Sequence, residues 1–305
     1  MAITLQESLR AAFYAPFYAA LARGAYTAEG VDIRFVSSPS PAEAARTLLD
    51  GSADVCWGGP MRVMATYQSD PDCDLVCFAE VVTRDPFLLI GSAPRPGFRP
   101  ADLLEAKLGS VSEVPTPWLC LQEDLRRAGI DPARVARVAD RSMAENCAAL
   151  RRGEIDVVQV FEPYATTLLA EGAGHLWYAA ASRGPTSYTT LYARRAVIAG
   201  KRDELRGMVR AIYHTQRWLA GASGSEIAAT VASYFPDVPQ PILAAAYDRY
   251  KALGIWGRDP ILPRDGYDRL RAGLVSGGLV DPGTPFETAV DNSLAEEILT
   301  AAPHA

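Results

Sequence analysis

The segment Ser40–Val55, SPAEAARTLLDGSADV, occurs a second time as Ser142–Val157, SMAENCAALRRGEIDV. At a constant offset of 102 residues, seven positions are identical: Ser40/Ser142, Ala42/Ala144, Glu43/Glu145, Leu48/Leu150, Gly51/Gly153, Asp54/Asp156 and Val55/Val157. This repetition indicates that the chain contains two units of similar design.

Each copy has the pattern of a helix that leads into a strand. The serine is suited to the N-cap, and the glutamate three residues later completes a capping box. Pro41 stands where the first helical residue is expected, and its missing N–H costs nothing there. The glycine is suited to the left-handed end of the helix, and an apolar run follows it, VCWGG in one copy and VVQVF in the other. We therefore expect two α/β lobes with a ligand cleft between them.

The rest of the chain continues this alternation of strands and helices. Strands are predicted at 3–9, 31–36, 55–57, 75–80, 87–92, 107–111, 135–138, 157–161 and 188–193, and helices at 15–28, 118–128, 204–220, 241–253 and 260–273. Alternating β and α segments are typical of parallel sheets covered by helices. The fold class predicted is α/β, with two similar lobes, each a mostly parallel sheet flanked by helices.

The lobes are expected to be discontinuous in sequence. The chain crosses between them near 86–92 and again near 187–193. Residues 1–88 and 192–305 are assigned to lobe 1, and residues 89–191 to lobe 2. Two crossing segments form a hinge, which suits closure around a ligand. Arg84 and Asp85, just before the first crossing, are expected to pair with each other there.

Composition excludes several classes of partner. The chain has 305 residues, 49% hydrophobic and 22% charged, with a formal net charge of −6. Because no stripe of Lys or Arg is present, nucleic acid is not expected as a partner. No apolar stretch approaches the roughly 20 residues that span a bilayer, so direct membrane insertion is not expected either. The N-terminus, MAITLQESLR, lacks the pattern of an export signal, which indicates a cytoplasmic protein or a leader already removed.

No metal, cofactor or catalytic motif emerges. The five cysteines, Cys56, Cys73, Cys77, Cys120 and Cys147, follow no ligand spacing and are interpreted as mostly small buried hydrophobes. The three histidines are not in a metal-binding pattern. The chain also lacks a nucleophile elbow, a phosphate loop and a dinucleotide fingerprint. Binding without chemistry is therefore favoured, with no cofactor.

Ligands of parallel α/β sheets bind beyond the carboxyl ends of the strands. This rule nominates a set of cleft residues: Phe13, Tyr14, Phe17, Ser38, Gly58, Gly59, Pro60, Glu113, Thr116, Trp118, Arg141, Phe161, Glu162 and Tyr188. Thr116 with Pro117 is predicted to start a helix as an N-cap pair, so free N–H groups would face the cleft.

Some of these residues allow a second interpretation. The aromatic residues could pack in the core instead, and Trp118 could pack between the lobes. Glu162 could accept a hydrogen bond from a ligand or pair with Arg141. Thr116, Ser38 and Arg141 would suit an anion such as nitrate or a sulfonate. The aromatic residues with Glu162 would suit a ring with an amine edge, so a small aromatic or pyrimidine-like ligand is favoured.

The opening of the chain resembles a known family. FYAPFYAALARGAYTAEGVDIRFV (Phe13–Val36) is similar to the start of the substrate-binding proteins of nitrate, sulfonate, taurine and thiamine-precursor ABC transporters. The matching elements are Pro16, Tyr18, Ala20, Gly24, Glu29, Gly30, Val31 and Asp32. GSADVCWGGP (Gly51–Pro60) and RRGEIDVVQVFEPYATTLL (Arg151–Leu169) resemble the family's strand segments in the two lobes, and Glu162, Pro163 and Tyr164 match the end of the second.

The resemblance implies a type 2 periplasmic-binding-protein fold and a monomer that delivers a small molecule to an ABC permease. It also implies a periplasmic location. The alternative is a cytoplasmic enzyme or ligand sensor on the same fold, similar to the thiamine-pyrimidine synthase or to aromatic-acid decarboxylases. Glu113 or Glu162 would then act as acid or base, with a pKa raised by the aromatic cleft. The cysteine-rich signature of the synthase is not found in this sequence.

Overall fold

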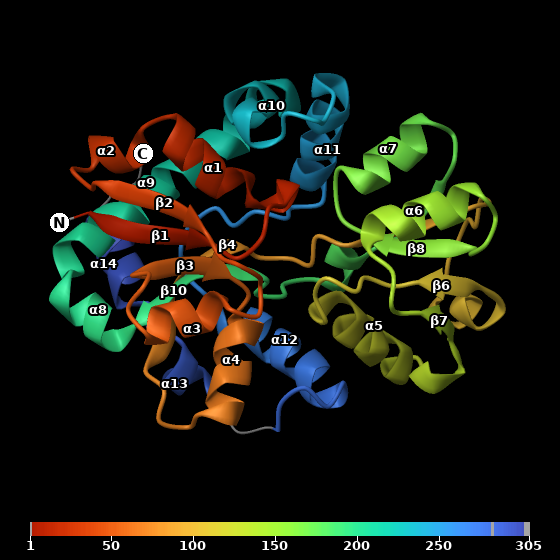
Figure 1. Ribbon diagram of the computed structural model, residues 1–305, viewed down its shortest axis with the longest axis horizontal. Coiled ribbons are helices and arrows are strands. Elements are labelled where there is room, and N and C mark those ends of the chain that lie inside the picture. The colour runs from red at the N-terminus through yellow and green to blue at the C-terminus, as the bar shows by residue number, and fades with distance from the viewer. Residues whose placement is uncertain (1, 282–283, 302–305) are drawn as a thin grey trace.

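The computed structural model describes residues 2–281 and 284–301 and contains two five-stranded sheets that lie side by side (Figure 1). The first has the order β2-β1-β3-β10-β4 and the second β7-β6-β8-β5-β9. In each sheet one strand, β10 or β5, runs antiparallel to both its neighbours, while the other four are parallel to one another. The predicted fold class is therefore confirmed.

The strands are short and mostly buried. Their bounds are β1 Ile3–Glu7, β2 Ile33–Ser37, β3 Val55–Gly58, β4 Leu75–Val82, β5 Leu88–Gly91, β6 Lys107–Gly109, β7 Ala136–Val138, β8 Val157–Val160, β9 His175–Ala179 and β10 Thr189–Arg194. Strands β3, β5 and β8 inside the sheets, and the edge strand β4, are buried along their whole length, as expected of strands covered on both faces.

The helices flank these sheets. They are α1 Ala15–Ala22, α2 Ala25–Ala28, α3 Ala44–Leu49, α4 Pro60–Ser69, α5 Thr116–Arg127, α6 Met143–Arg151, α7 Tyr164–Ala170, α8 Arg195–Gly200, α9 Arg202–Gly221, α10 Gly224–Val231, α11 Gln240–Ala252, α12 Arg264–Ser276, α13 Phe286–Ala289 and α14 Ser293–Ala301. The single helix predicted over 15–28 is interrupted at Gly24, whose φ of 66° ends α1 and starts α2.

The repeated segment makes the same structural connection in both lobes. Asp54 Oδ2 accepts a hydrogen bond from the backbone N–H of Thr4 at 2.8 Å, and Asp156 Oδ2 accepts one from that of Lys107 at 2.7 Å. Asp54 lies just before β3 and holds β1 beside it, and Asp156 lies just before β8 and holds β6 beside it. Gly51 and Gly153 both have positive φ after the helix, as predicted.

The two copies differ at the start of their helices. Ser142 forms the predicted capping box with Glu145 at the start of α6. In the first copy the helix α3 begins at Ala44, with Glu43 in the N-cap position and no side-chain cap. Pro41 is therefore not the first helical residue, because residues 41–43 form a turn, but the Ser40 hydroxyl still accepts the capping hydrogen bond from the Glu43 N–H, at 3.3 Å.

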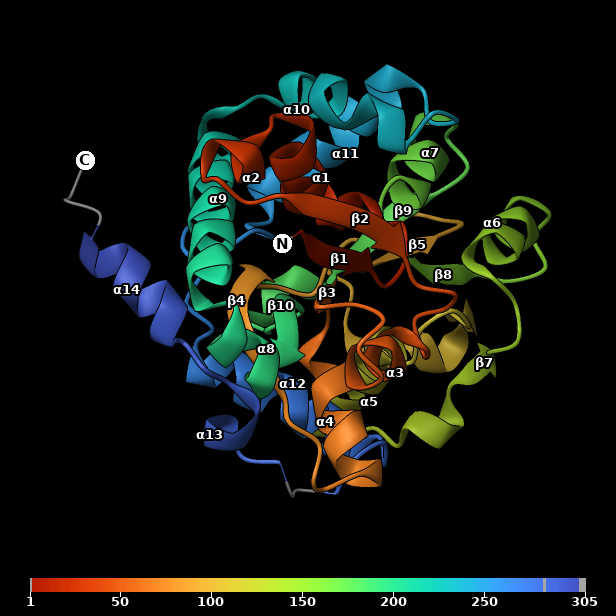
Figure 2. The same ribbon diagram turned by 60° about the vertical axis from the view of Figure 1, so that its left-hand side comes forward.

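The chain passes between the sheets twice, from β4 to β5 and from β9 to β10. Helices from the two sides also meet: α5 packs against α12, and α7 packs against α11 (Figure 1). Figure 2 shows α10 and α11 above the first sheet, with α12 and α5 on the opposite side of the molecule. The exact lobe boundaries at 88/89 and 191/192 stay a prediction.

All five cysteines are free and buried, which confirms their interpretation as small core residues. Among the helices that the structure describes, none combines the length and apolarity needed to cross a membrane.

Candidate functional site: a cleft between the two sheets

A narrow pocket lies where the two lobes meet and has a volume of about 50 Å³. We call it the deep pocket. Its lining comes from both lobes: Ser8, Leu9, Phe13, Tyr14, Pro41, Gly58, Gly59, Met61, Arg62, Phe87, Val114, Thr116, Phe161, Tyr188 and Tyr192. Most of these residues follow the carboxyl end of a strand or begin the next helix, as the general rule for parallel sheets predicts.

A wider space of about 870 Å³ adjoins the deep pocket, and we call it the outer groove. It is lined by Leu9, Arg10, Ala11, Ala12, Pro41, Glu113, Met143, Ala144, Cys147, Arg151, Phe161, Pro163, Tyr164, Thr167, Phe235, Asp237, Val238 and Pro239. Leu9, Pro41 and Phe161 border both spaces, so the deep pocket and the outer groove adjoin at these residues, and we call the two together the cleft.

Aromatic rings form the wall of the deep pocket. The Phe13 ring centroid lies 4.4 Å from that of Tyr14, 5.3 Å from that of Phe161 and 6.2 Å from that of Tyr188, all in edge-to-face arrangements. Phe161 belongs to the second lobe and Phe13 to the first, so this cluster joins the lobes across the pocket. Edge-to-face packing holds each ring in a defined orientation.

Two hydroxyls of residues that line the deep pocket, those of Tyr188 and Tyr192, have no partner among the described residues. Tyr188 is only 8% exposed, and no hydrogen bond is found for its hydroxyl within the described ranges 2–281 and 284–301. Tyr14, by contrast, shares a 3.3 Å hydrogen bond with Ser8. A buried polar group without a partner costs free energy, so its presence in a pocket points to a ligand that completes it.

The deep pocket also has a cation without a counter-ion. Arg62 is half-buried in the first turn of α4, and its guanidinium forms no hydrogen bond or ion pair with any residue that the structure describes. The part of the lining that comes from described residues contains no Asp or Glu. An unpaired guanidinium in a partly buried site favours binding of an anionic group.

Two helix N-termini border the same pocket. Gly59 caps α4 and Thr116 begins α5, and neither helix has a side-chain cap at its start. Pro60 and Pro117 have no N–H, and the Arg62 N–H donates to the Gly59 carbonyl at 2.9 Å, so only some first-turn positions can offer an N–H to a ligand. The helix dipoles add to the positive potential. The prediction that Thr116 is itself the N-cap is wrong, because Pro115 holds that position and Thr116 is the first helical residue.

The predicted site residues divide into two groups. The structure brings Phe13, Tyr14, Gly58, Gly59, Thr116, Phe161 and Tyr188 together in the deep pocket, and it places Glu113 at the outer groove. The remaining six, which are Phe17, Ser38, Pro60, Trp118, Arg141 and Glu162, line neither space. Their placement corrects the prediction, and each has a structural reason.

Glu162 is fully buried away from the cleft. Its Oε2 accepts a hydrogen bond from the Thr166 backbone N–H at 2.8 Å, and its Oε1 accepts one from Arg249 Nε at 2.8 Å. The expected partner Arg141 instead pairs with Glu154 at 3.2 Å. Burial raises the pKa of Glu162, and the hydrogen bond from Thr166 and the charge of Arg249 oppose that rise. Glu162 therefore connects the second lobe to α11 rather than facing a ligand.

The other four residues pack locally. Phe17 stacks on Trp57 with ring centroids 4.6 Å apart, and Trp118 lies under the Arg137 guanidinium at 4.4 Å. The Ser38 hydroxyl donates to the Ser40 carbonyl at 2.7 Å. Pro60 is the first residue of α4 and is buried there.

Several lining residues were not predicted from the sequence. They are Ser8, Leu9, Pro41, Arg62, Phe87 and Tyr192 in the deep pocket. Ser8 and Leu9 directly follow β1, so the strand-end rule could have found them. Arg62 lies two residues beyond the nominated Pro60, and its place in the first turn of α4 brings it to the pocket.

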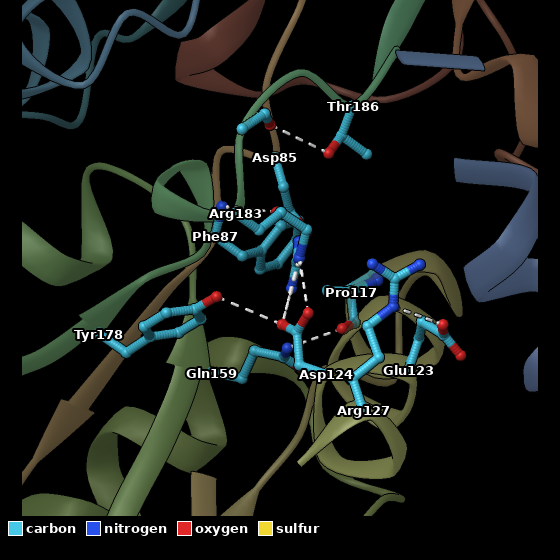
Figure 3. A network of polar contacts seen from close by, with 11 residues as sticks. Asp85, Phe87, Pro117, Glu123, Asp124, Arg127, Gln159, Tyr178, Arg183 and Thr186 are labelled. Carbon is cyan, nitrogen blue, oxygen red and sulfur yellow. Dashed lines mark hydrogen bonds and ion pairs between the residues drawn. The ribbon is translucent and has the colours of Figure 1, made fainter. Parts of the chain in front are cut away.

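The crossing segments are held by a buried ionic network (Figure 3). Arg183, in the short 3-10 helix Ala180–Arg183, is 8% exposed at its side chain and donates to Asp85 at 2.6 Å. It also donates through Nε to both oxygens of Asp124 on α5 at 3.1 Å. The expected pair between Arg84 and Asp85 is therefore wrong, because Asp85 pairs with Arg183. Gln159 Nε2 donates to the Pro117 carbonyl at 2.9 Å and fixes the start of α5 to β8.

No group of three or more His, Cys, Asp or Glu side chains suited to a metal ion occurs in the part of the chain that the structure covers.

This fold is that of the two-lobe periplasmic binding proteins, as the sequence predicted. The alkanesulfonate-binding protein SsuA of Xanthomonas axonopodis pv. citri, bound to MOPS, matches with a TM-score of 0.73 and 14% identity over 96% of this chain and 98% of that chain. The desulfurization enzyme DSZB matches with a TM-score of 0.68 and 14% identity over 98% and 99% of the two chains. The fold is therefore shared with both a binding protein and an enzyme.

The sequence comparisons agree with this class. The model of the NMT1-like family matches residues 98–233, which confirms the predicted resemblance. The protein YtlA of Bacillus subtilis (strain 168), whose name describes it as a binding protein, is 23% identical over 301 residues, covering 97% of this chain and 89% of YtlA.

Proposed function

We propose that this chain is the ligand-binding component of an ABC-type import system and that it closes on a small organic molecule in the cleft without changing it. The fold and the similarity to binding proteins along nearly the whole chain support this proposal. The proposal includes delivery to an ABC permease, action as a monomer and a periplasmic location.

The ligand is a small organic anion with an aromatic or other apolar part. The observation that carries this assignment is the guanidinium of Arg62, which has no ion-pair partner. The same pocket is lined by Tyr188, whose buried hydroxyl has no hydrogen-bond partner among the described residues. The uncapped starts of α4 and α5 would add N–H donors to an anionic group. The ring cluster around Phe13 offers contact to an apolar part.

The amine-edged ring favoured by the sequence depended on Glu162 as an acceptor. Because both oxygens of that carboxylate are already hydrogen-bonded and the side chain is fully buried, it offers no acceptor to a ligand in the cleft. A carboxylate or sulfonate on the ring fits the charges of the deep pocket better than an amine.

A thermal-shift screen tests the proposal, with mass spectrometry of each compound after incubation. Benzoate and other aromatic carboxylates, alkyl sulfonates, and aminopyrimidines would be compared. At about 100 times its dissociation constant, a ligand stabilises the fold by about 2.7 kcal/mol. We expect the anions to raise the melting temperature and to be recovered intact.

Chemical conversion of a bound compound would instead support an enzymatic function. The desulfurization enzyme DSZB has a similar fold. Stabilisation by aminopyrimidines alone would overturn the anionic ligand while leaving the binding function in place. An Arg62→Met variant should lose at least about tenfold in affinity for the anions. The exposed Arg46→Met variant, on α3, serves as its control, because Arg46 pairs with Glu43 outside the cleft.

A further inference from the structure

The two parts of the cleft differ greatly in size. The deep pocket has a volume of about 50 Å³ and the outer groove about 870 Å³. Pockets for organic ligands usually measure about 300–1,000 Å³. The deep pocket alone therefore has room for little more than a head group, and the rest of a bound organic molecule must lie in the groove that continues from it past Leu9, Pro41 and Phe161.

One helix supplies a regular stripe of groove residues. Met143, Cys147 and Arg151 lie at intervals of four along α6, so they share one helix face, and Ala144 borders the same face. Tyr164 on α7 and Phe235 and Val238 before α11 continue the apolar wall from the other elements. Contact with this wall would be made mostly by apolar groups.

The charged groups of the groove are largely engaged with the protein itself. Arg10 pairs with Glu7 at 2.6 Å, and Arg151 pairs with Glu171 at 2.7 Å. Glu113 accepts a hydrogen bond from the Met143 backbone N–H at 2.9 Å. Asp237 is exposed at the rim. The described residues that line the groove therefore include no free cation like Arg62, so this lining does not favour a second anionic group.

We infer that the outer groove is a specificity subsite for the apolar body of the ligand, and that Ala144 and Cys147 of α6 set the size of the body it accepts. This inference rests on the proposed function, because the anionic head group in the deep pocket orients the body toward the groove. Cys147 acts here as a small apolar residue. Its side chain is buried, and burial raises the pKa of its thiol to about 12, so it is not a reactive thiolate.

Larger side chains at these positions would shorten the groove. Ala144 is exposed on α6, so Ala144→Phe should fold normally while its ring occupies the groove. Cys147→Phe changes the adjoining buried position and serves as a second variant. Arg152→Phe is the matched control, because Arg152 lies at the end of α6, is exposed and does not line the cleft.

The experiment measures binding of benzoate and 4-hexylbenzoate by calorimetry, with methanesulfonate and octanesulfonate as a second pair. We expect the wild-type chain to bind the longer member of each pair at least about tenfold more tightly. Ala144→Phe should remove most of this preference and change benzoate or methanesulfonate affinity less than about twofold. Arg152→Phe should behave as the wild type.

The outcomes separate the two proposals. If the short acids bind but the longer ones gain nothing, or if Ala144→Phe weakens both members of a pair equally, the groove is not a specificity subsite, although the proposed function stands. If Cys147→Phe unfolds, Ala144→Phe alone decides. If no acid of either pair binds, the anionic ligand of the proposed function is wrong and the inference falls with it.

Discussion

Arg183 joins the second crossing segment to α5 through the carboxylate of Asp124, and its other side bonds to Asp85 of the first crossing segment (Figure 3). Because α5 begins at Thr116 in the deep pocket, this ionic network connects the two crossing segments with one wall of the deep pocket. The relationship explains how two segments about a hundred residues apart in sequence keep a fixed position relative to the cleft.

Removal of Arg183 should strongly destabilise the protein. In Arg183→Met, Asp85, which is 1% exposed, loses its counter-ion while it stays buried. Breaking a buried pair in this way typically costs about 3–5 kcal/mol. Urea unfolding of the variant measures the loss. The control is Arg127→Met, whose exposed pair with Glu123 should contribute about 0–1 kcal/mol. Equal stability of the two variants would contradict a structural role of the network.

Glu80 on β4 should make stability depend on pH. Its side chain is 2% exposed, and burial raises its pKa from 4.5 to about 8, while the nearby side chains of Ser187 and Thr83 oppose that rise. Between these values the folded carboxyl keeps its proton while the unfolded one has lost it. The free energy of unfolding should therefore fall as pH rises from about 4.5 to about 8, by at most about 1.4 kcal/mol per pH unit.

Glu80→Gln removes this titration and should flatten the dependence. Urea unfolding at pH 5 and pH 8 compares the variant with the wild type. The exposed Glu105→Gln variant serves as control and should keep the wild-type slope. A Glu80→Gln variant whose stability still falls between these two pH values as steeply as the wild type would refute the assignment.

The sequence was sufficient to predict the fold because the signals for it are local and repeated. The helix-to-strand segment occurs twice, and the loops after the parallel strands follow from the strand order. Phe13, Gly58 and Thr116 were found at the cleft by this rule. Their position depends only on where a strand ends, so no long-range contact has to be known.

The predicted cleft residues that line neither space are mostly side chains whose partners are far away in sequence. Glu162 is engaged by Arg249, which lies 87 residues later, and no local pattern reveals that pairing. Phe17 follows the same loop as Phe13, but the turn of α1 directs it onto Trp57 instead of into the pocket. Arg62 was missed for the opposite reason. A guanidinium without an ion-pair partner is recognised only when its three-dimensional surroundings are known.

The repeated aspartates should each contribute to stability. Asp54 and Asp156 accept backbone hydrogen bonds that hold β1 and β6 in place, and a hydrogen bond to a charged group contributes about 1.5–3 kcal/mol. Because Asp156 is exposed, Asp156→Ala should lower the free energy of unfolding by about 1 kcal/mol. Asp54→Ala should lower it somewhat more, because this variant also loses the ion pair with Lys201. Chemical unfolding tests both. Asp140→Ala, an exposed aspartate outside the repeat, should change stability by less than about 0.5 kcal/mol.

Two tyrosines separate ligand binding from stability. The buried Tyr188 hydroxyl has no partner within the described residues, so Tyr188→Phe should change the free energy of unfolding by less than about 0.5 kcal/mol but weaken ligand binding about fivefold. The Tyr250 hydroxyl accepts from the Glu162 backbone N–H at 2.8 Å and donates to the Pro86 carbonyl at 3.3 Å. Tyr250→Phe should therefore destabilise the fold by about 1–2 kcal/mol.

Tyr250 lines neither part of the cleft, so the affinity of the folded Tyr250→Phe protein should stay near the wild-type value. Melting curves and calorimetry with benzoate as the probe measure both quantities for both variants. Loss of stability without loss of affinity in Tyr188→Phe would show that its hydroxyl has a structural partner and does not serve the ligand. We expect Tyr188→Phe to lose affinity but not stability, and Tyr250→Phe to lose stability but not affinity. This result would show that the Tyr188 hydroxyl forms its hydrogen bond with the bound molecule and not with the protein.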